Sequence, residues 1–410
     1  MRVLLAIDLF DDANNGTTVS ARRFAHALLE RGHEVRAATV RADALGLDVP
    51  DDGVGRYPLD PLGIAGFNGI IARQGMRLAR PDDAVLRDAL GWADVVHVMS
   101  PFWLGRRTTL LADRLGVPAT GAFHVQPENI TSSFRLGHVG PLNDALYALF
   151  RPMFNRFGHV HCPSRFIAGE LRDHGYDAEL HVVSNGVDPS FRPRVRAHRD
   201  DPGAPFVVMM TGRLSVEKRQ DLLIEAVRRS RYADRIQLVL AGRGPLEKKL
   251  AHQGASLALP PQIGFYPQDE LQDLLAASDL YVHAADAEIE AIGCLEAIAT
   301  GLVPVISDSH HSATGQFALD ERSLFRAGDA KALARAIDGW LDDDAERARM
   351  GRVYAESARA YGLDASVTQL EAMLRQAVVD HHAALVEGRA PAGGDDTEPW
   401  PDDEDAAYEH

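Results

Sequence analysis

Two glutamates placed eight residues apart, Glu288 and Glu296, are the most informative chemical feature of this sequence. They belong to HAADAEIEAIGCLEAIATGLVPVIS (283–307), in which an apolar strand-like run precedes a helix-like segment. If 292–300 is helical and ends at Gly301, helical rise places the two acids on the order of 10 Å apart. The paired carboxylates of a retaining glycosidase stand closer, about 5–5.5 Å apart. We therefore expect the two acids to bind different parts of one long ligand, with a structural arginine as the alternative partner of Glu296.

A pair of basic residues follows another strand-like run, in TGRLSVEKRQDLLIEA (211–226). The pattern predicts that Gly212 and Arg213 end the strand, that Ser215 caps a helix, and that Lys218 lies in its first turn. Cations at a helix N-terminus oppose the helix dipole by about 0.3–1 kcal/mol. Their placement therefore indicates a bound anion such as a diphosphate, unless the cations form surface ion pairs, for example with Glu217.

A third strand-like run ends in LAGRGPLEKKL (240–250), where Gly242 and Gly244 would let the backbone approach a ligand closely. Two glycines after a strand are a common pattern, so this indication is less specific than the paired glutamates.

The elements that must position these residues follow a repeating order, in which short apolar runs alternate with longer helix-like segments. Examples of the runs are RVLLAID (2–8), VVHVM (95–99), FVVMMTG (206–212) and IQLVLAG (236–242). Apolar runs without polar alternation are typical of parallel strands covered on both faces. We predict an α/β fold of two Rossmann-like, doubly wound domains facing across a cleft, where ligands bind beyond the carboxyl ends of the strands.

The predicted boundary between the domains is the segment 187–205, which contains four prolines and a cluster of charges. We predict one domain over 1–190 and a second domain over 203–363. A C-terminal helix over 364–387 and a disordered acidic tail over 388–410 follow.

Composition excludes several classes of partner. The net charge is −16, but eight of the last sixteen residues are acidic, so half of the excess lies in the tail. The sequence has no basic block, which argues against nucleic-acid binding.

We also predict no metal site. The two cysteines, Cys162 and Cys294, lack metal-ligand spacing, and the acids Asp342–Asp344 stand at the start of a predicted helix, where acidic side chains stabilise the helix dipole. The sequence has no run of eighteen apolar residues and begins with MRVLLAIDLFDD, which lacks the basic head of a secretion signal. We expect a cytoplasmic protein, at most peripheral on a membrane.

The two motifs together resemble the retaining, two-Rossmann-domain (GT-B) glycosyltransferases of the glycosyltransferase 4 / group 1 family. The resemblance rests on Glu288-x7-Glu296, on LEAIATGLVPVIS behind it and on TGRLSVEKRQDLLIEA ahead of it. It implies that Arg213 and Lys218 neutralise the diphosphate of a nucleotide sugar without a metal or other cofactor, and that Glu296 binds the ribose.

The same resemblance assigns the rest of the donor site. Glu288 and the backbone N–H groups of Ile292 and Gly293 would hold the donor sugar, and Phe265 and Tyr266 would lie along the base. The usual Gly-Phe-Gly between the two acids is replaced here by Ile289-Glu290-Ala291. Additional side chains near the sugar put its identity in question.

In the first half of the chain, the resemblance assigns Gly16 to a loop that closes over the donor phosphates. His124, in GAFHVQPENI (121–130), is similar to the histidine that contacts the transferred sugar, with an ordinary hydrogen-bonded loop histidine as the alternative. Glu128 and Asn129 would meet the acceptor, and Asn185–Asp188 marks the hinge. Direct attack on the donor's front face, with retention of configuration, is implied by the family.

The acceptor is predicted from a finer resemblance. FHVQPENI, EIEAIGCLEAIATGLVPVIS and SATGQFALDERSLF are similar to a bacterial branch that glucosylates diacylglycerol. The hypothesis is therefore transfer of glucose from UDP-glucose to a membrane lipid. Two basic segments with apolar faces, 66–81 and 142–157, would contact an anionic membrane surface or pack in the core.

Three other functions remain open at this point. The first is mannosyl transfer to a phosphoinositide, polysaccharide or small molecule. The second is binding of a nucleotide sugar without turnover. The third, a nicotinamide-dependent oxidoreductase, is disfavoured because no G-x-G-x-x-G follows the first strand.

Overall fold

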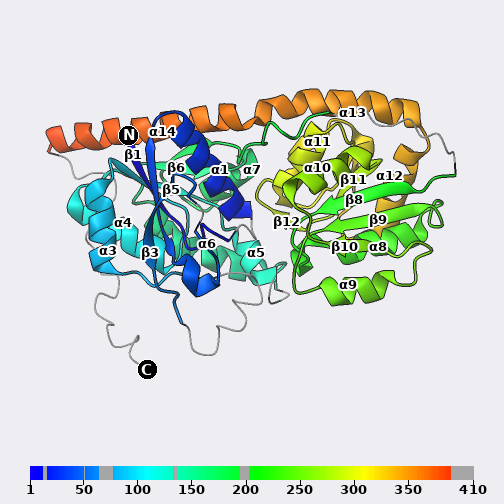
Figure 1. Ribbon diagram of the computed structural model, residues 1–410, viewed down its shortest axis with the longest axis horizontal. Coiled ribbons are helices and arrows are strands. Elements are labelled where there is room, and N and C mark those ends of the chain that lie inside the picture. The colour runs from blue at the N-terminus through cyan, green and yellow to red at the C-terminus, as the bar shows by residue number, and fades with distance from the viewer. Residues whose placement is uncertain are drawn as a thin grey trace.

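The computed structural model describes residues 1–12, 16–49, 51–63, 77–132, 134, 136–193 and 203–388. Within them, two parallel β-sheets are each covered by helices and stand side by side along the long axis of the molecule (Figure 1). This arrangement confirms the predicted α/β fold of two Rossmann-like domains. The acidic tail beyond Gly388 lies outside the described residues.

Seven parallel strands form the first sheet in the order β3-β2-β1-β4-β5-β6-β7. They are β1 (Arg2–Ala6), β2 (Glu34–Val40), β3 (Gly55–Leu59), β4 (Val95–Val98), β5 (Ala119–Ala122), β6 (His159–Cys162) and β7 (Glu179–Val182). Its helices are α1 (Gly16–Glu30), α3 (Asp83–Trp92), α4 (Trp103–Leu115), α5 (Pro127–Ser132), α6 (Gly140–Phe154) and α7 (Arg165–Asp173). Because the strand order reverses at β1, a crevice for ligands is expected at its carboxyl end.

Six parallel strands form the second sheet in the order β10-β9-β8-β11-β13-β15. They are β8 (Phe206–Thr211), β9 (Ile236–Ala241), β10 (Gln262–Gly264), β11 (Leu280–His283), β13 (Pro304–Ser307) and β15 (Leu324–Phe325). Its helices are α8 (Gln220–Arg229), α9 (Glu247–Gly254), α10 (Gln268–Ala277), α11 (Ile292–Ala299), α12 (Ala330–Leu341) and α13 (Asp344–Ala358). A short ribbon of β12 (Ala287–Glu288) and β14 (His311–Ser312) lies beside this sheet.

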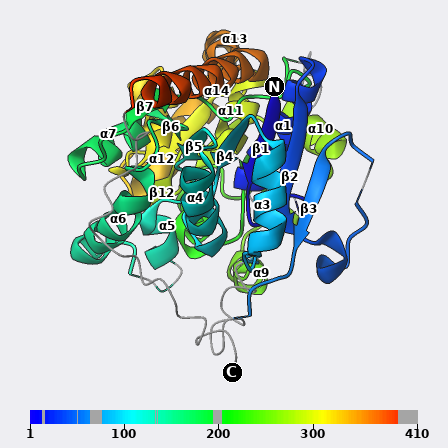
Figure 2. The same ribbon diagram turned by 90° about the vertical axis from the view of Figure 1, so that its left-hand side faces the viewer.

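The last helix, α14 (Leu363–Val386), returns from the second domain to the first (Figures 1 and 2). Its side chains Val367, Leu370, Met373 and Leu374 are buried in one cluster with Val3 and Leu5 of β1. Burial of each such side chain stabilises the contact by about 1.5–3 kcal/mol. The chain therefore crosses between the domains twice, once after β7 and once before α14.

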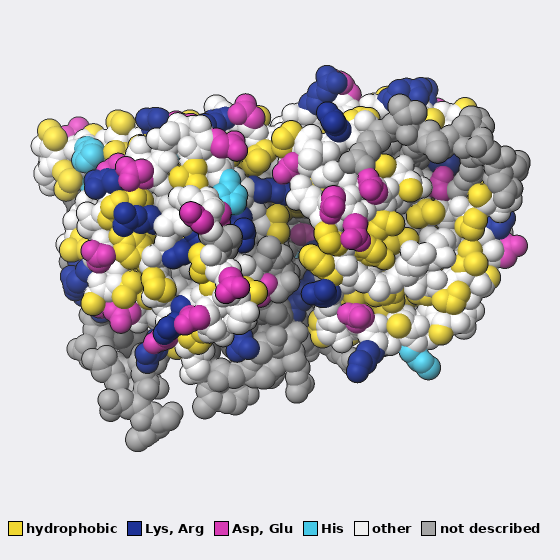
Figure 3. Space-filling model, in the orientation of Figure 1, with side chains coloured by type: hydrophobic (Ala, Val, Ile, Leu, Met, Phe, Trp, Pro, Cys, Tyr) yellow, Lys and Arg dark blue, Asp and Glu magenta, His cyan; other side chains and the backbone are white. Residues whose placement is uncertain are grey.

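The acids at 342–344 belong to a helix start, as predicted. Asp343 is the N-cap of α13 and accepts a hydrogen bond from the Glu346 amide at 2.9 Å. In the view of Figure 3, basic and acidic side chains are interspersed over both domains. The described residues on that face form no continuous basic patch for a polyanion.

Candidate active site

Lys218 and Glu288 meet at the carboxyl end of the second sheet. The Lys218 ammonium contacts Glu288 Oε2, and His283 Nε2, at the end of β11, lies 3.4 Å from the same oxygen. Burial alone would raise the pKa of Glu288, but the ammonium and the imidazole outweigh it and hold this pKa well below its ordinary range. Glu288 is therefore a carboxylate at neutral pH. His283 was not singled out from the sequence, although its place at a strand's carboxyl end is a signal.

The loop that carries Lys218 differs from the prediction. Lys218 ends a 3₁₀ turn over Val216–Lys218, and Arg219 at φ 57° separates this turn from α8. Lys218 therefore lies before the helix and not in its first turn. The strained backbone is stabilised because the Arg219 guanidinium pairs with Asp286 at 2.9 Å and Asp221 at 3.2 Å.

Ser215 does not form the predicted side-chain cap of a helix, and Arg213 lies near an acidic side chain of the same loop. The Ser215 hydroxyl donates to Glu217, and no side-chain cap bond forms at this position. Burial lowers the pKa of Arg213, and the Glu217 carboxylate acts in the opposite direction. An ion pair with Glu217, the alternative to a bound anion, thus applies in part to Arg213, whereas the Lys218 ammonium pairs with Glu288.

The N-terminus of α11 is the third part of this site. Gly293 is required there because a Cβ would lie 2.0 Å from Thr211 Oγ1. The first N–H groups of the helix, on Ile292 and Gly293, have no intrahelical acceptor and are available to an anion or a sugar oxygen. Gly16, at the start of α1, lies beside the Ile292 side chain: a Cβ on Gly16 would be 3.8 Å from Ile292 Cδ1.

Glu296 bonds to the other domain. Arg23 Nη2, on α1, lies 2.6 Å from Glu296 Oε1, and Arg23 Nη1 donates to the Gly186 carbonyl at 3.2 Å. Burial raises the pKa of Glu296, and Arg23 opposes this shift. The structure therefore shows the alternative in which an arginine, Arg23, is the partner of Glu296. Because a carboxylate offers about four lone-pair sites, one arginine does not exclude a ribose.

His124 lies against two other buried histidines of the first sheet. Its ring meets His161 edge to face at a centroid distance of 4.9 Å, and His161 stacks on His97 at 5.8 Å. Burial lowers the pKa of His97 to about 3 and of His161 to about 4, and it lowers that of His124 well below 6.5. Both ring nitrogens of His124 have no hydrogen-bond partner among the described residues. A neutral imidazole there can donate to one ligand oxygen and accept from another.

Glu290, noted in the sequence only as a departure from the family, lies at the hinge. The Asn185 amide donates to Glu290 Oε2 at 2.8 Å, and burial raises the pKa of Glu290 to about 7. Ala291, its neighbour, adopts φ 72°, the left-handed region. The usual glycine would adopt this conformation without strain.

Gly242 and Gly244 allow a close approach between two loops of the protein itself. A Cβ on Gly242 would lie 2.0 Å from the Gly212 carbonyl oxygen, and one on Gly244 would lie 2.4 Å from that of Leu214. The two glycines are therefore required by the close packing against the Arg213 loop, which explains them without a ligand.

The two aromatic residues after β10 differ in surroundings. Phe265 is 53% exposed, and the Arg243 guanidinium stacks on its ring at 4.8 Å. Tyr266 packs against the core of the second domain. Phe265 is therefore the more exposed of the two rings, and Arg243 covers part of it.

The loop after His124 contacts the second domain. Gln126 Nε2 donates to the His311 carbonyl at 3.0 Å, and Glu128 accepts from the Tyr147 hydroxyl at 3.3 Å. Glu128 is 4% exposed. Its carboxylate thus has protein partners where the resemblance expected an acceptor; Asn129 follows it on α5.

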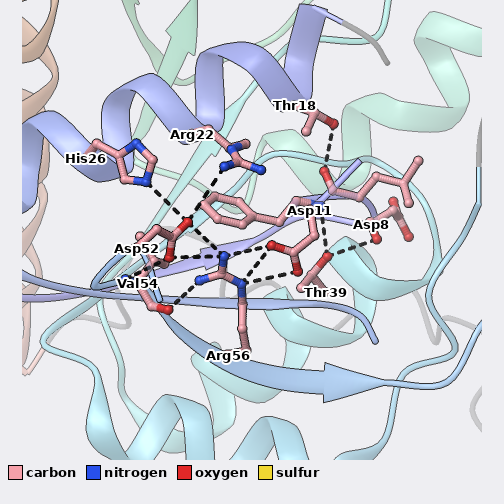
Figure 4. Close-up of polar contacts among 11 residues, drawn as sticks. Asp8, Asp11, Thr18, Arg22, His26, Thr39, Asp52, Val54 and Arg56 are labelled. Carbon is pink, nitrogen blue, oxygen red and sulfur yellow. Dashed lines mark hydrogen bonds and ion pairs between the residues drawn. The ribbon is translucent and has the colours of Figure 1, made fainter. Parts of the chain in front are cut away.

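A charged cluster that the sequence did not reveal joins the loop after β1 to the amino end of β3 (Figure 4). Arg56 pairs with Asp11 at 2.7 Å and with Asp52 at 3.1 Å, and Asp52 also contacts His26 at 3.3 Å. Nearby, Asp8 is buried and accepts from the Ala79 amide at 2.8 Å, and burial raises its pKa to about 6. Long-range pairs of this kind leave no local sequence pattern.

The two predicted membrane-contact segments have different outcomes. Of 66–81, only 77–81 is described; it is not helical, and Leu78 is buried, while Phe67, Ile71 and Arg73 lie outside the described residues. In 142–157, Phe150, Met153 and Phe157 are buried, which fits core packing, whereas Leu149 is 52% exposed. Among the described helices, none is long and apolar enough to cross a bilayer.

Comparison with known proteins covers both halves of the chain. The model for "Glycosyltransferase Family 4" matches residues 14–191, and that for "Glycosyl transferases group 1" matches residues 191–356. A GDP-mannose-dependent alpha-mannosyltransferase of Corynebacterium glutamicum is 28% identical over 389 residues, covering 90% of this chain and 87% of the relative. An alpha-monoglucosyldiacylglycerol synthase of Streptococcus pneumoniae is 25% identical over 228 residues, 52% of this chain and 51% of the relative. The Anabaena protein HepE in complex with UDP-glucose has a TM-score of 0.70 at 17% identity, over 92% of this chain and 100% of that one.

Proposed function

Because this chain belongs to the group 1 glycosyltransferases of the GT-B fold, we propose that it transfers a hexose from a nucleotide-diphosphate sugar where its two domains face each other. One observation carries the proposal: Lys218, Glu288 and the N-terminus of α11 converge at the carboxyl end of the second sheet. This is where open α/β sheets bind their ligands.

The chemistry follows from the charges. Departure of a nucleoside diphosphate leaves a dianionic group, and the Lys218 ammonium, the Arg213 guanidinium and the N–H groups of α11 would stabilise it. Glu288, fixed by Lys218 and His283, would accept hydrogen bonds from sugar hydroxyls. Glu296 would bind the ribose, and Phe265 would lie against the base.

Retention of configuration is part of the proposal. Glu288 contacts an ammonium and an imidazole, so it is poorly suited to act as a nucleophile on the sugar. In the proposed front-face reaction, the leaving phosphate receives the acceptor's proton. His124, a neutral imidazole whose two buried nitrogens have no hydrogen-bond partner among the described residues, would hydrogen-bond the transferred sugar and position it. Neutralisation of the diphosphate by cationic side chains supports a reaction that is independent of metal.

Two donor–acceptor pairs are candidates. Glucose transfer from UDP-glucose to diacylglycerol at the cytoplasmic face of a membrane is supported by the relative that synthesises alpha-monoglucosyldiacylglycerol, over half of each chain. Mannose transfer from GDP-mannose, to a phosphoinositide, a polysaccharide or a small molecule, is supported by the mannosyltransferase that covers nine-tenths of this chain. The broader coverage favours GDP-mannose as the first donor to test.

An acceptor would enter from the first domain, at the carboxyl end of β1. Asp8 and Asp11 follow that strand, and Arg56, at the amino end of β3, pairs with Asp11 (Figure 4). Carboxylates beside a guanidinium can bind the hydroxyls of a polyol head group or a sugar.

The test is an incubation of the full chain with UDP-glucose, GDP-mannose, UDP-galactose and UDP, each with lipid extract, diacylglycerol vesicles, phosphatidylinositol or oligosaccharide. Release of nucleotide with formation of an α-linked product, assigned by NMR, is the expected result. Donor binding without turnover on every acceptor would favour the non-catalytic binding protein. Flotation with anionic and neutral vesicles tests contact with an anionic membrane surface, and flotation that does not depend on anionic lipid would contradict it.

A further inference from the structure

Three potential metal ligands lie together on one face of the first sheet, away from the proposed active site. His159 is the first residue of β6 and pairs in register with Glu179, the first residue of β7; His181 follows two residues later. Residues two apart on a strand share a face. His159 and Glu179 therefore stand at the amino-terminal ends of β6 and β7, with His181 two residues farther along β7, whereas the proposed diphosphate site uses carboxyl ends of the other sheet.

The spacing of their ligand atoms suits one small ion. His159 Nδ1 lies 2.9 Å from His181 Nε2, and the Glu179 oxygens lie 3.6 Å from each of these two nitrogens. In tetrahedral zinc sites with bonds of about 2.0–2.1 Å, neighbouring ligand atoms stand roughly 3.3 Å apart. The observed distances lie on both sides of this value, so small side-chain rotations suffice to close the site.

A carboxylate from another element orients the first ligand. Asp380, on α14, lies 3.0 Å from His159 Nε2. With the ring proton on Nε2, where Asp380 accepts it, Nδ1 presents a lone pair toward His181. Metal-binding histidines commonly donate their second ring N–H to a carboxylate in this way.

We propose that His159, Glu179 and His181 bind one zinc ion, with water as the fourth ligand, and that the ion fixes α14 to the edge of the first sheet through Asp380. Two imidazoles and a carboxylate form a borderline donor set that suits zinc better than magnesium or calcium. His159 is 4% exposed, and Glu179 and His181 are more accessible, so the ion can enter from solvent. His181 would carry its proton on Nδ1, toward solvent, when Nε2 binds the metal. The site has no part in the proposed transfer of sugar.

The experiment uses the full chain without a histidine tag, stripped with chelator and titrated with zinc chloride. The expected result is one tightly bound zinc per chain by calorimetry and elemental analysis. Saturation at a hundredfold excess over Kd should raise the thermal midpoint on the order of 5 °C. Magnesium chloride at the same concentration should leave the midpoint unchanged.

The variants separate a metal site from a simple hydrogen-bonded pair. His181→Asn and Glu179→Gln should each lose the bound zinc and the shift, and Asp380→Asn should weaken zinc binding about 10–100-fold. His382→Asn, on the exposed face of α14, should bind zinc like the parent. Because Glu179 is 65% exposed, its variant should fold even if His181→Asn does not. Absence of saturable zinc binding in the parent, or equal binding by Glu179→Gln, would overturn the proposal.

Discussion

Arg23 of the first domain and Glu296 of the second form an ion pair across the domain boundary, with Nη2 2.6 Å from Oε1. Both side chains are nearly buried, at 12% and 9% exposure. A carboxylate proposed to bind the donor's ribose thus also holds the two domains together. Donor binding and the relative position of the domains are therefore expected to be coupled through Glu296.

Replacing this carboxylate should impair donor binding. Loss of a charged hydrogen-bond acceptor costs about 1.5–3 kcal/mol, so Glu296→Gln should raise the donor KM at least about tenfold, with a smaller effect on kcat. Initial rates at varied donor concentration measure this. Glu356→Gln, an exposed acid on α13, is the matched control. An unchanged donor KM in Glu296→Gln would leave Glu296 only its structural role with Arg23.

Replacing Ala291 by glycine should stabilise the folded protein. Its φ of 72° costs a residue with a Cβ about 1–2 kcal/mol, part of which is offset because glycine loses more entropy on folding. Ala291→Gly should therefore raise the free energy of unfolding by roughly 0.5–1 kcal/mol, measured by urea denaturation. Ala355→Gly, in the regular helix α13, should lower it by about 1 kcal/mol. A loss of stability in both variants would contradict the strain assigned to Ala291.

Gly293 should tolerate no side chain. The Cβ of Gly293→Ala would lie 2.0 Å from Thr211 Oγ1 and would displace the N-terminus of α11, with a large loss of kcat. Thr211→Ala removes that oxygen, so the double variant should recover part of the activity. Gly16→Ala, whose Cβ meets Ile292 at an ordinary 3.8 Å, should keep the parent's stability. Equal losses in the single and double variants would show that the collision is not the cause.

Stability should fall as the pH rises through neutrality. Burial raises the pKa of Glu290 to about 7 from an ordinary 4.5, so the folded state binds this proton more tightly than the unfolded state does. Its contribution is complete below about pH 4.5 and is lost as the pH rises through 7. Asp8, with a pKa of about 6, acts in the same direction. The thermal midpoint of Glu290→Gln should therefore change less between pH 5 and 8 than that of the parent. An equal change in both proteins would contradict the assignment.

The two sheets were predictable because their strands are continuous apolar runs between helix-like segments. The junctions that carry Lys218 and Glu288 were predictable because polar residues follow such runs directly. The Arg23–Glu296 pair was not, since its members lie 273 residues apart and nothing in either segment specifies the other. The conformation of Arg219 was not predictable either, because its left-handed backbone depends on Asp286 from a distant loop. His159 and His181 were overlooked because only the pairing register between β6 and β7 brings them together.

The most direct test of the account is the rate of sugar transfer by Lys218→Ala. Lys218 is proposed to stabilise the departing diphosphate, and loss of one such preorganised group typically lowers kcat about 10²–10³-fold. Lys249→Ala, an exposed lysine on α9, is the matched control, and circular dichroism checks that both variants fold. The account predicts a kcat at least about a hundredfold below the parent for Lys218→Ala alone; a folded Lys218→Ala that turns over donor at the parent's rate would contradict it.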